Sequence, residues 1–166
     1  MKERSLVLNG FSKAFAMTGW RIGYACGPAD VIAAITKVHQ YGIMSAPTMS
    51  QYGALEGLRH GDEEVAKMVA SYDERRKVIV QGFRDMGLSC FEPKGAFYCF
   101  PCIKSTGMSS EEFVELLLKE EKVAVVPGNA FGASGEGFIR CSYASSMENI
   151  KEALKRIEAF INRHKK

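Results

Sequence analysis

The sequence predicts an α/β protein built from two parts, and three observations lead to this fold class. Short apolar runs that are typical of strands alternate with longer stretches of helical spacing. One helical stretch of roughly 24 residues, from Asp62 to Met86, is long for a globular protein and can join two lobes. The sequence after it alternates strands and helices, which is typical of an α+β domain. We therefore expect one domain over residues 1–70 and a second over residues 71–166.

Two short strands open the first part. Ser5 to Leu8 is an apolar run that ends at Asn9-Gly10, and Arg21 to Cys26 is a second run that ends at Gly27-Pro28. The residues between them are therefore a connection between strands.

Three helices follow these strands. The first starts with Pro28 at its first position and continues through Val38. Ala46-Pro47 ends this helix, and a second helix is expected from Thr48 to His60. The third is the long helix, whose first turn carries the acids Asp62 to Glu64, where negative charge complements the helix dipole.

The second part is predicted to hold three strands, over Gly95 to Phe100, Val123 to Val126 and Gly137 to Tyr143. The motifs Ser109-Ser-Glu-Glu112 and Ser145-Ser-Met-Glu148 each read as a capping box that opens an amphipathic helix. We expect these helices to pack on a small sheet.

Composition excludes several classes of function. The 166 residues are 46% hydrophobic with a net charge of +3, which is typical of a soluble globular protein. No apolar run reaches the ~18 residues of a membrane span, and no secretory signal opens the chain. The net charge of +3 is too small to indicate a basic surface that binds nucleic acid. We expect a cytoplasmic protein without a membrane or nucleic-acid partner.

The cysteines and histidines predict neither disulfides nor a metal site. Five scattered cysteines without an export signal indicate reduced thiols. The pair Cys99-Phe-Pro-Cys102 lies in an expected strand and its exit, whereas a redox pair opens a helix. The three histidines show no paired spacing with the cysteines.

The connection between the first two strands carries the candidate chemistry. A lysine amine attacks an aldehyde only when it is neutral often enough, which requires desolvation or a nearby cation. Lys13 lies among small and apolar residues, and Arg21 carries a rigid fork that suits a phosphate dianion. The residues alone leave a second interpretation open, in which Lys13 is solvated and Arg21 pairs with a carboxylate.

The run Gly10-Phe-Ser-Lys13-Ala-Phe-Ala-Met-Thr-Gly-Trp-Arg21-Ile-Gly23 resembles the pyridoxal-phosphate attachment signature of the class I/II (fold type I) aminotransferases. The resemblance continues along the whole chain. Further matching motifs follow in the family's order: Pro47-Thr-Met-Ser-Gln51, Gly95-Ala-Phe-Tyr98, Val126-Pro-Gly128 with Phe131-Gly132, and Gly137-Phe-Ile-Arg-Cys-Ser-Tyr-Ala144. Three segments are similar to bacterial aspartate/aromatic-type enzymes, and most of all to N-acetyl-diaminopimelate aminotransferases: His39-Gln-Tyr, Ala46-Pro-Thr-Met-Ser-Gln51 and Gly135-Glu-Gly-Phe-Ile-Arg-Cys-Ser-Tyr-Ala144.

This resemblance implies a role for three residues. Lys13 would form the Schiff base with pyridoxal 5'-phosphate, and Arg21 would bind its phosphate. Arg140 would clamp the substrate α-carboxylate; from the residues alone, it could equally form a structural salt bridge. Gly10 stands where many relatives have a serine that contacts the phosphate, so that hydroxyl is absent or supplied elsewhere. The resemblance also brings Gly95 and Phe97 near the substrate, with Phe97 expected in the core.

The resemblance further implies the C-terminal portion of the large cofactor domain plus a complete α+β small domain. The activity would be transamination between an amino acid and a 2-oxo acid in a homodimer. In the family, a long stretch upstream of the lysine supplies the other cofactor ligands, including the aspartate on the pyridine nitrogen. We therefore expect this chain alone to be inactive. The alternative is a free-standing, non-catalytic α+β domain that acts as an interaction or folding module. The donor amino acid stays open.

Overall fold

The computed structural model describes residues 1–164, and the contacts within it divide the chain into two compact units, Met1–Met68 and Val69–Lys166. Helix α4, Asp62–Asp85, contributes residues to both units. None of the helices in the described range is both long and apolar enough to cross a membrane.

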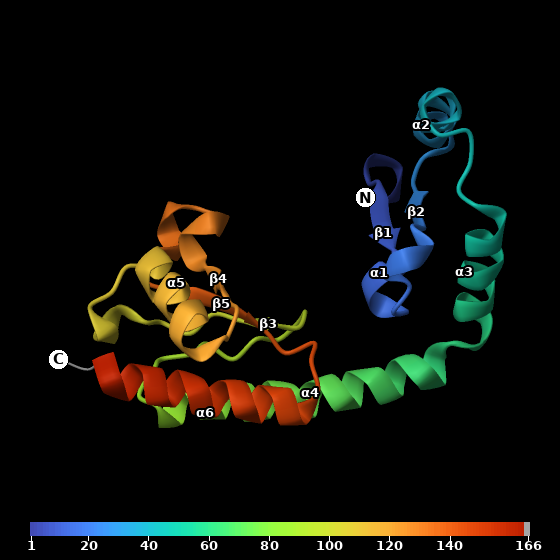
Figure 1. Cartoon of the computed structure of the whole chain (residues 1–166). Helices are drawn as coiled ribbons and strands as arrows, with labels where there is room; N and C mark the ends of the chain where they lie inside the picture. The colour runs from blue at the N-terminus through green and yellow to red at the C-terminus, as the bar shows by residue number, and fades with distance from the viewer. Residues whose placement is uncertain (165–166) are drawn as a thin grey trace. The chain divides into compact units, whose positions relative to one another are not determined.

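The first unit contains an antiparallel pair of strands, β1 (Val7–Gly10) and β2 (Gly23–Cys26) (Figure 1). Asn9 and Gly10 were expected to end the first strand, and this was wrong. They belong to β1, because Gly10 pairs with Gly23 and Asn9 with the residue after it. The connection between the strands holds the short helix α1, Phe11–Ala14.

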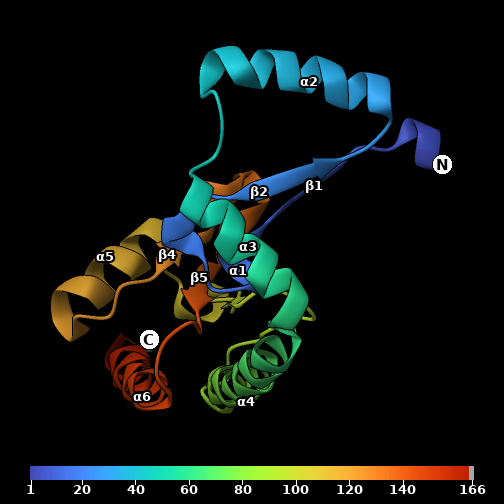
Figure 2. The ribbon, with the colours of Figure 1, turned by 90° about the vertical axis from the view of Figure 1, so that its right-hand side faces the viewer.

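Two further helices of this unit follow, α2 (Ala29–Gly42) and α3 (Thr48–His60). Helix α3 has the predicted bounds. Pro28 is the N-cap of α2 and not its first residue, because its ψ of 141° is extended. Helix α2 buries no residue, and Figure 2 shows it lying apart from α1 within this unit.

The first unit has a very small core. Its buried cluster consists of Phe11, Met17 and Ala54. Many large apolar side chains of the unit are exposed instead: Leu6, Val7, Leu8, Trp20, Tyr24, Val31, Ile35, Val38, Tyr41, Ile43, Met44, Met49, Tyr52, Leu55 and Leu58. Monomeric proteins rarely expose this many large apolar side chains together, so the unit carries surface suited to further protein.

The second unit is built on an antiparallel sheet with the strand order β3-β5-β4. The strands are Tyr98–Cys99, Ile139–Ser142 and Val126–Pro127 in that order. All three are shorter than predicted. The left-handed φ angles of Ala96 (58°) and Gly137 (81°) interrupt the extended backbone before β3 and β5. On β4, only Val126 and Pro127 pair with β5.

Helices α4, α5 (Ser110–Glu121) and α6 (Met147–His164) pack on this sheet. Figures 1 and 2 show α6 running beside α4, where a Cβ on Gly82 would lie 2.6 Å from a methyl of Leu154. The predicted cap of α5 is confirmed, because Ser109 Oγ accepts a hydrogen bond from the Glu112 N–H at 3.2 Å.

The expected cap of α6 was one residue too early. Ser146, not Ser145, accepts the hydrogen bond from the Asn149 N–H, at 3.2 Å. The helix begins at Met147, so the residue directly before it is the N-cap.

A continuous apolar core fills the second unit. Phe83, Phe113 and Phe160 are fully buried, and the rings of Phe113 and Phe160 meet edge to face at 5.1 Å. Burying one such side chain contributes roughly 2–3 kcal/mol. This unit therefore has the core that the first unit lacks.

The buried thiols belong to this core. Cys99 lies on β3 directly opposite Cys141 on β5, and Cys90 lies beside them. Hydrogen bonding with Cys99, and then burial, raises the pKa of the Cys90 thiol. Hydrogen bonding with Cys141 raises that of Cys99. Because the thiolate is the reactive form, these cysteines act as packing residues.

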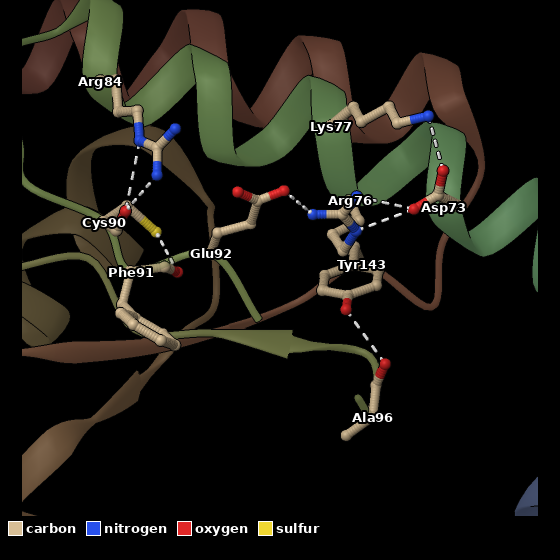
Figure 3. A network of polar contacts seen from close by, with 9 residues as sticks. All are labelled: Asp73, Arg76, Lys77, Arg84, Cys90, Phe91, Glu92, Ala96 and Tyr143. Atoms are coloured by element: carbon tan, nitrogen blue, oxygen red, sulfur yellow. Dashed lines mark hydrogen bonds and ion pairs between the residues drawn. The ribbon is translucent and has the colours of Figure 1, made fainter. Parts of the chain in front are cut away.

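A polar network fixes the segment 90–96 to α4 (Figure 3). Arg76, whose side chain is only 18% exposed, pairs with Asp73 at 2.7 Å and also with Glu92. Arg84 donates a hydrogen bond to the Cys90 carbonyl at 3.0 Å, and Tyr143 donates one to the Ala96 carbonyl at 3.0 Å. The loop before β3 is thus held at both ends.

This network predicts a loss of stability in acid. Hydrogen bonds from Lys77 and Arg76 lower the pKa of Asp73, and Arg76 lowers that of Glu92. The folded pKa lies below the unfolded value of about 4, so the stabilisation is present above pH ~4 and is lost as pH falls through the folded pKa. The melting temperature should stay level from pH 7 to about 5 and fall below about 4.

Thermal unfolding followed by circular dichroism at a series of pH values checks this expectation. Glu92→Gln should make the acid decline of the melting temperature shallower. Glu115→Gln is the matched control, since the described residues offer Glu115 no ion pair. An equal slope in both variants would contradict the role of the network.

Candidate functional site

Backbone pairing closes the connection between β1 and β2. Gly10 lies opposite Gly23, and the Phe11 N–H donates to the Ile22 carbonyl at 3.2 Å. A Cβ at Gly23 would lie 2.7 Å from the Asn9 carbonyl oxygen, so this position has no room for a side chain. The two ends of the segment 11–22 are therefore fixed to each other.

Helix α3 packs closely on this segment through two glycines one turn apart. A Cβ at Gly53 would lie 2.9 Å from the Trp20 ring, and one at Gly57 would lie 3.3 Å from the Phe15 ring. The Ser50 hydroxyl donates to the Trp20 carbonyl at 2.6 Å. The connection between β1 and β2 therefore packs closely on α3, although many of its residues are exposed to solvent.

Lys13 lies on α1 and is exposed. Throughout residues 1–164, its amine makes no hydrogen bond or ion pair. The desolvation expected from its apolar neighbours is not provided by this unit. The reason is that Phe11 turns into the core, while Ala14 and Ala16 are too small to cover the amine.

Arg21 has a left-handed backbone conformation, with φ 51° and ψ 50°. Such a conformation is uncommon outside glycine and often marks a functional position. Its Nη1 donates to the Thr18 carbonyl at 3.0 Å, and within the described part of the chain it pairs with no carboxylate. The other N–H groups of the guanidinium are available for an anion.

The connection carries two cationic side chains. Among the described residues, Lys13 offers a primary amine without a protein partner, and Arg21 offers a guanidinium without a counter-ion. The Gly10–Gly23 pair places two residues without side chains at the base of this connection. Both residues lie in the same closed connection, whereas Arg140 lies in the second unit.

Arg140 projects from the middle of β5 between two buried neighbours, Ile139 and Cys141. Side chains alternate along a strand, so Arg140 lies on the other face of the sheet. Its guanidinium carbon lies 4.4 Å from the centre of the Tyr98 ring and 4.3 Å from that of Phe131. The structural salt bridge considered above is absent among residues 1–164, because no carboxylate lies within 4.0 Å.

Tyr98 and Phe131 were not singled out from the sequence as site residues. Tyr98 was one residue of an expected strand, and Phe131 was named only as part of the matching pair Phe131-Gly132. Phe97, which was expected in the core, is partly buried against it and stacks on Tyr72 with ring centres 5.9 Å apart. Alternation along β3 was the one signal that could have placed Tyr98 beside Arg140.

Comparison with known proteins gives a consistent result. Residues 1–157 match the family model described as Aminotransferase class I and II. The protein YugH of Bacillus subtilis (strain 168), whose name says aminotransferase and specifies no substrate, is 58% identical over 98% of this chain and 42% of its own length. An aspartate aminotransferase of Pyrococcus abyssi is 47% identical over 99% of this chain and 43% of its own.

Solved structures agree with the sequence relatives. The crystal structure of an aromatic aminotransferase from Pyrococcus horikoshii superposes with a TM-score of 0.93 at 45% identity, covering 98% of this chain and 44% of that chain. The matched region is the C-terminal part of such structures. The present chain thus spans less than half the length of the proteins it resembles.

Proposed function

Because the chain belongs to the class I and II aminotransferases, we propose that the protein it forms transfers amino groups between an amino acid and a 2-oxo acid. The observation that carries this proposal is the closed connection with two cations, Lys13 and Arg21, that pair with no carboxylate among the described residues. An amine and a guanidinium without protein counter-ions, on a fixed backbone, are suited to one ligand that bears both an aldehyde and a phosphate.

The family depends on pyridoxal 5'-phosphate, which when bound supplies an electron sink for cleavage of the substrate Cα–H bond. Lys13 would attach it covalently, and Arg21 would bind its phosphate. The Lys13 Nζ would act as the base that takes the proton from the substrate α-carbon. Arg140 would hold the α-carboxylate and thereby orient that C–H bond.

We further propose that residues 1–70 are the last part of the large cofactor domain and that residues 71–166 are the small domain. The open apolar faces of the first unit support this, since they need further protein to cover them. The same faces lead us to propose that the chain alone neither binds the cofactor tightly nor transaminates. A homodimer and a cytoplasmic location complete the proposal; the five free cysteines fit a reducing compartment.

The substrate class follows from the relatives only in outline. Their names include aspartate aminotransferase and aromatic-amino-acid aminotransferase. We therefore propose 2-oxoglutarate as acceptor and an acidic or aromatic amino acid as donor, with alanine and N-acetyl-diaminopimelate as further candidates.

The test uses the whole protein supplied with pyridoxal 5'-phosphate. It is incubated with 2-oxoglutarate and each candidate donor, and the new oxo acid is measured. Borohydride reduction followed by peptide mass mapping should place a pyridoxyl group on Lys13. The 166-residue chain alone, treated identically, should show neither product. If the whole protein also shows neither, the proposal is wrong, and the non-catalytic module becomes the better interpretation.

A further inference from the structure

The guanidinium of Arg140 lies between two aromatic rings. Tyr98 covers it at 4.4 Å and Phe131 at 4.3 Å, each distance joining the guanidinium carbon and a ring centre. Both lie well within the ~6 Å over which a cation and the negative face of an aromatic ring attract each other. The two rings come from different elements, since Tyr98 lies on β3 and Phe131 ends the 3₁₀ turn Gly128–Phe131.

The sheet register explains how Tyr98 reaches Arg140. Tyr98 pairs directly with Ser142, which lies two residues beyond Arg140 on β5. Side chains two residues apart on a strand share a face, and diagonal neighbours across an antiparallel pair are within reach of an aromatic ring. Cys99 and Cys141 pair on the core face. Because of this register, the side chains of Tyr98 and Arg140 lie on the same face of the sheet.

Phe131 is difficult to explain as a packing residue. It is 51% exposed, so it contributes little to the core. It lies against Arg140 and makes an edge-to-face pair with Phe100, whose ring centre lies 5.8 Å away at an interplanar angle of 79°. A large, exposed aromatic ring whose face lies on a cation is best explained by what it does to that cation.

Arg140 is only partly buried, so part of its side chain is open to solvent. A cation between two ring faces directs its N–H groups outward in the plane between them, which is where a planar carboxylate forms two parallel hydrogen bonds. In the region that the structure describes, no protein carboxylate occupies this position. The charge is thus stabilised by ring faces and is not neutralised before a ligand arrives.

We propose that Tyr98 and Phe131 are positioning residues that hold the plane of the Arg140 guanidinium ready for the substrate carboxylate. This rests on the proposed function, in which Arg140 binds that carboxylate. The rings fix the orientation of the fork in the free protein and exclude water from both of its faces. Because carboxylate binding is then preorganised, their loss weakens binding of the amino acid and the oxo acid more than it slows the chemical step.

The experiment compares variants of the whole, cofactor-loaded protein. Tyr98→Leu and Phe131→Leu remove one ring face each, whereas Tyr98→Phe and Phe131→Tyr keep it. Phe91→Leu is the matched control, because Phe91 is 79% exposed in the same unit and does not contact Arg140. We expect each leucine variant to raise KM for both substrates about threefold to tenfold with little change in kcat, and both ring-preserving variants to behave as wild type.

A second readout does not depend on activity. In arginine-labelled protein, ring currents should shift the side-chain CH₂ proton signals of Arg140 upfield. The shift should persist in Tyr98→Phe and shrink in Tyr98→Leu.

The outcomes separate this inference from the proposed function. Unchanged KM in both leucine variants, or an equal loss in Phe91→Leu, would overturn the positioning role. If Arg140→Leu nevertheless raises KM strongly, the carboxylate clamp stands without the rings. If Arg140→Leu also leaves KM unchanged, the clamp itself is wrong.

Discussion

Replacement of Lys13 by alanine in the whole protein is expected to abolish covalent attachment of pyridoxal 5'-phosphate and to lower kcat by about 10²- to 10⁴-fold. The amine is exposed and has no hydrogen-bond partner in the described chain, so no fold contact is lost. The melting temperature should therefore stay within about 2 °C of wild type. A large loss of activity without a loss of stability is the signature of a residue that acts on substrate.

Absorbance of the bound cofactor, borohydride trapping and single-turnover kinetics check this expectation together. Lys37→Ala is the control, since Lys37 is an exposed lysine on α2 of the same unit. Added methylamine should restore part of the activity of Lys13→Ala, because a free amine can replace the missing base. If Lys13→Ala turned over at the wild-type rate, Lys13 would have no catalytic role.

The helices could be predicted from the sequence because their signals are local. Helix α3 has its predicted bounds, Thr48–His60, and α5 has its predicted Ser109 cap. The strands of the second unit were predicted too long. Their ends depend on left-handed φ angles at Ala96 and Gly137 and on pairing with β5, and neither property is encoded in the apolar pattern of one strand.

The site divides in the same way. Lys13 and Arg21 stand out because a long local motif surrounds them. The left-handed backbone of Arg21 is not encoded in the residue type. The close approach of Gly53 to Trp20 could not be predicted, because it results from packing of α3 on the connection. Tyr98 and Phe131 both lie in motifs that resemble the family, but their shared position over Arg140 could not be predicted. It depends on the sheet register for Tyr98 and on the fold of the turn Gly128–Phe131 for Phe131.

Arg140→Leu is expected to lower kcat/KM for the amino acid by about thirtyfold or more, which corresponds to about 2 kcal/mol for the loss of one partner of a desolvated, hydrogen-bonded charge pair. Arg140→Lys should recover only part of this, because a point charge lacks the planar fork that binds both carboxylate oxygens. The control is Arg156→Leu, whose guanidinium pairs with Glu152 in the same unit.

Stability measurements on the same variants distinguish the clamp from a structural ion pair. A structural pair would leave a half-buried carboxylate alone when the arginine is removed, and the protein would lose stability. Arg140 has no such partner among residues 1–164. Arg140→Leu should therefore leave the melting temperature unchanged or raise it slightly, because a half-buried, unneutralised charge is replaced by an apolar side chain. A marked fall in melting temperature with unchanged KM would make Arg140 a structural residue, whereas a raised KM at constant stability identifies a charge kept free for its ligand.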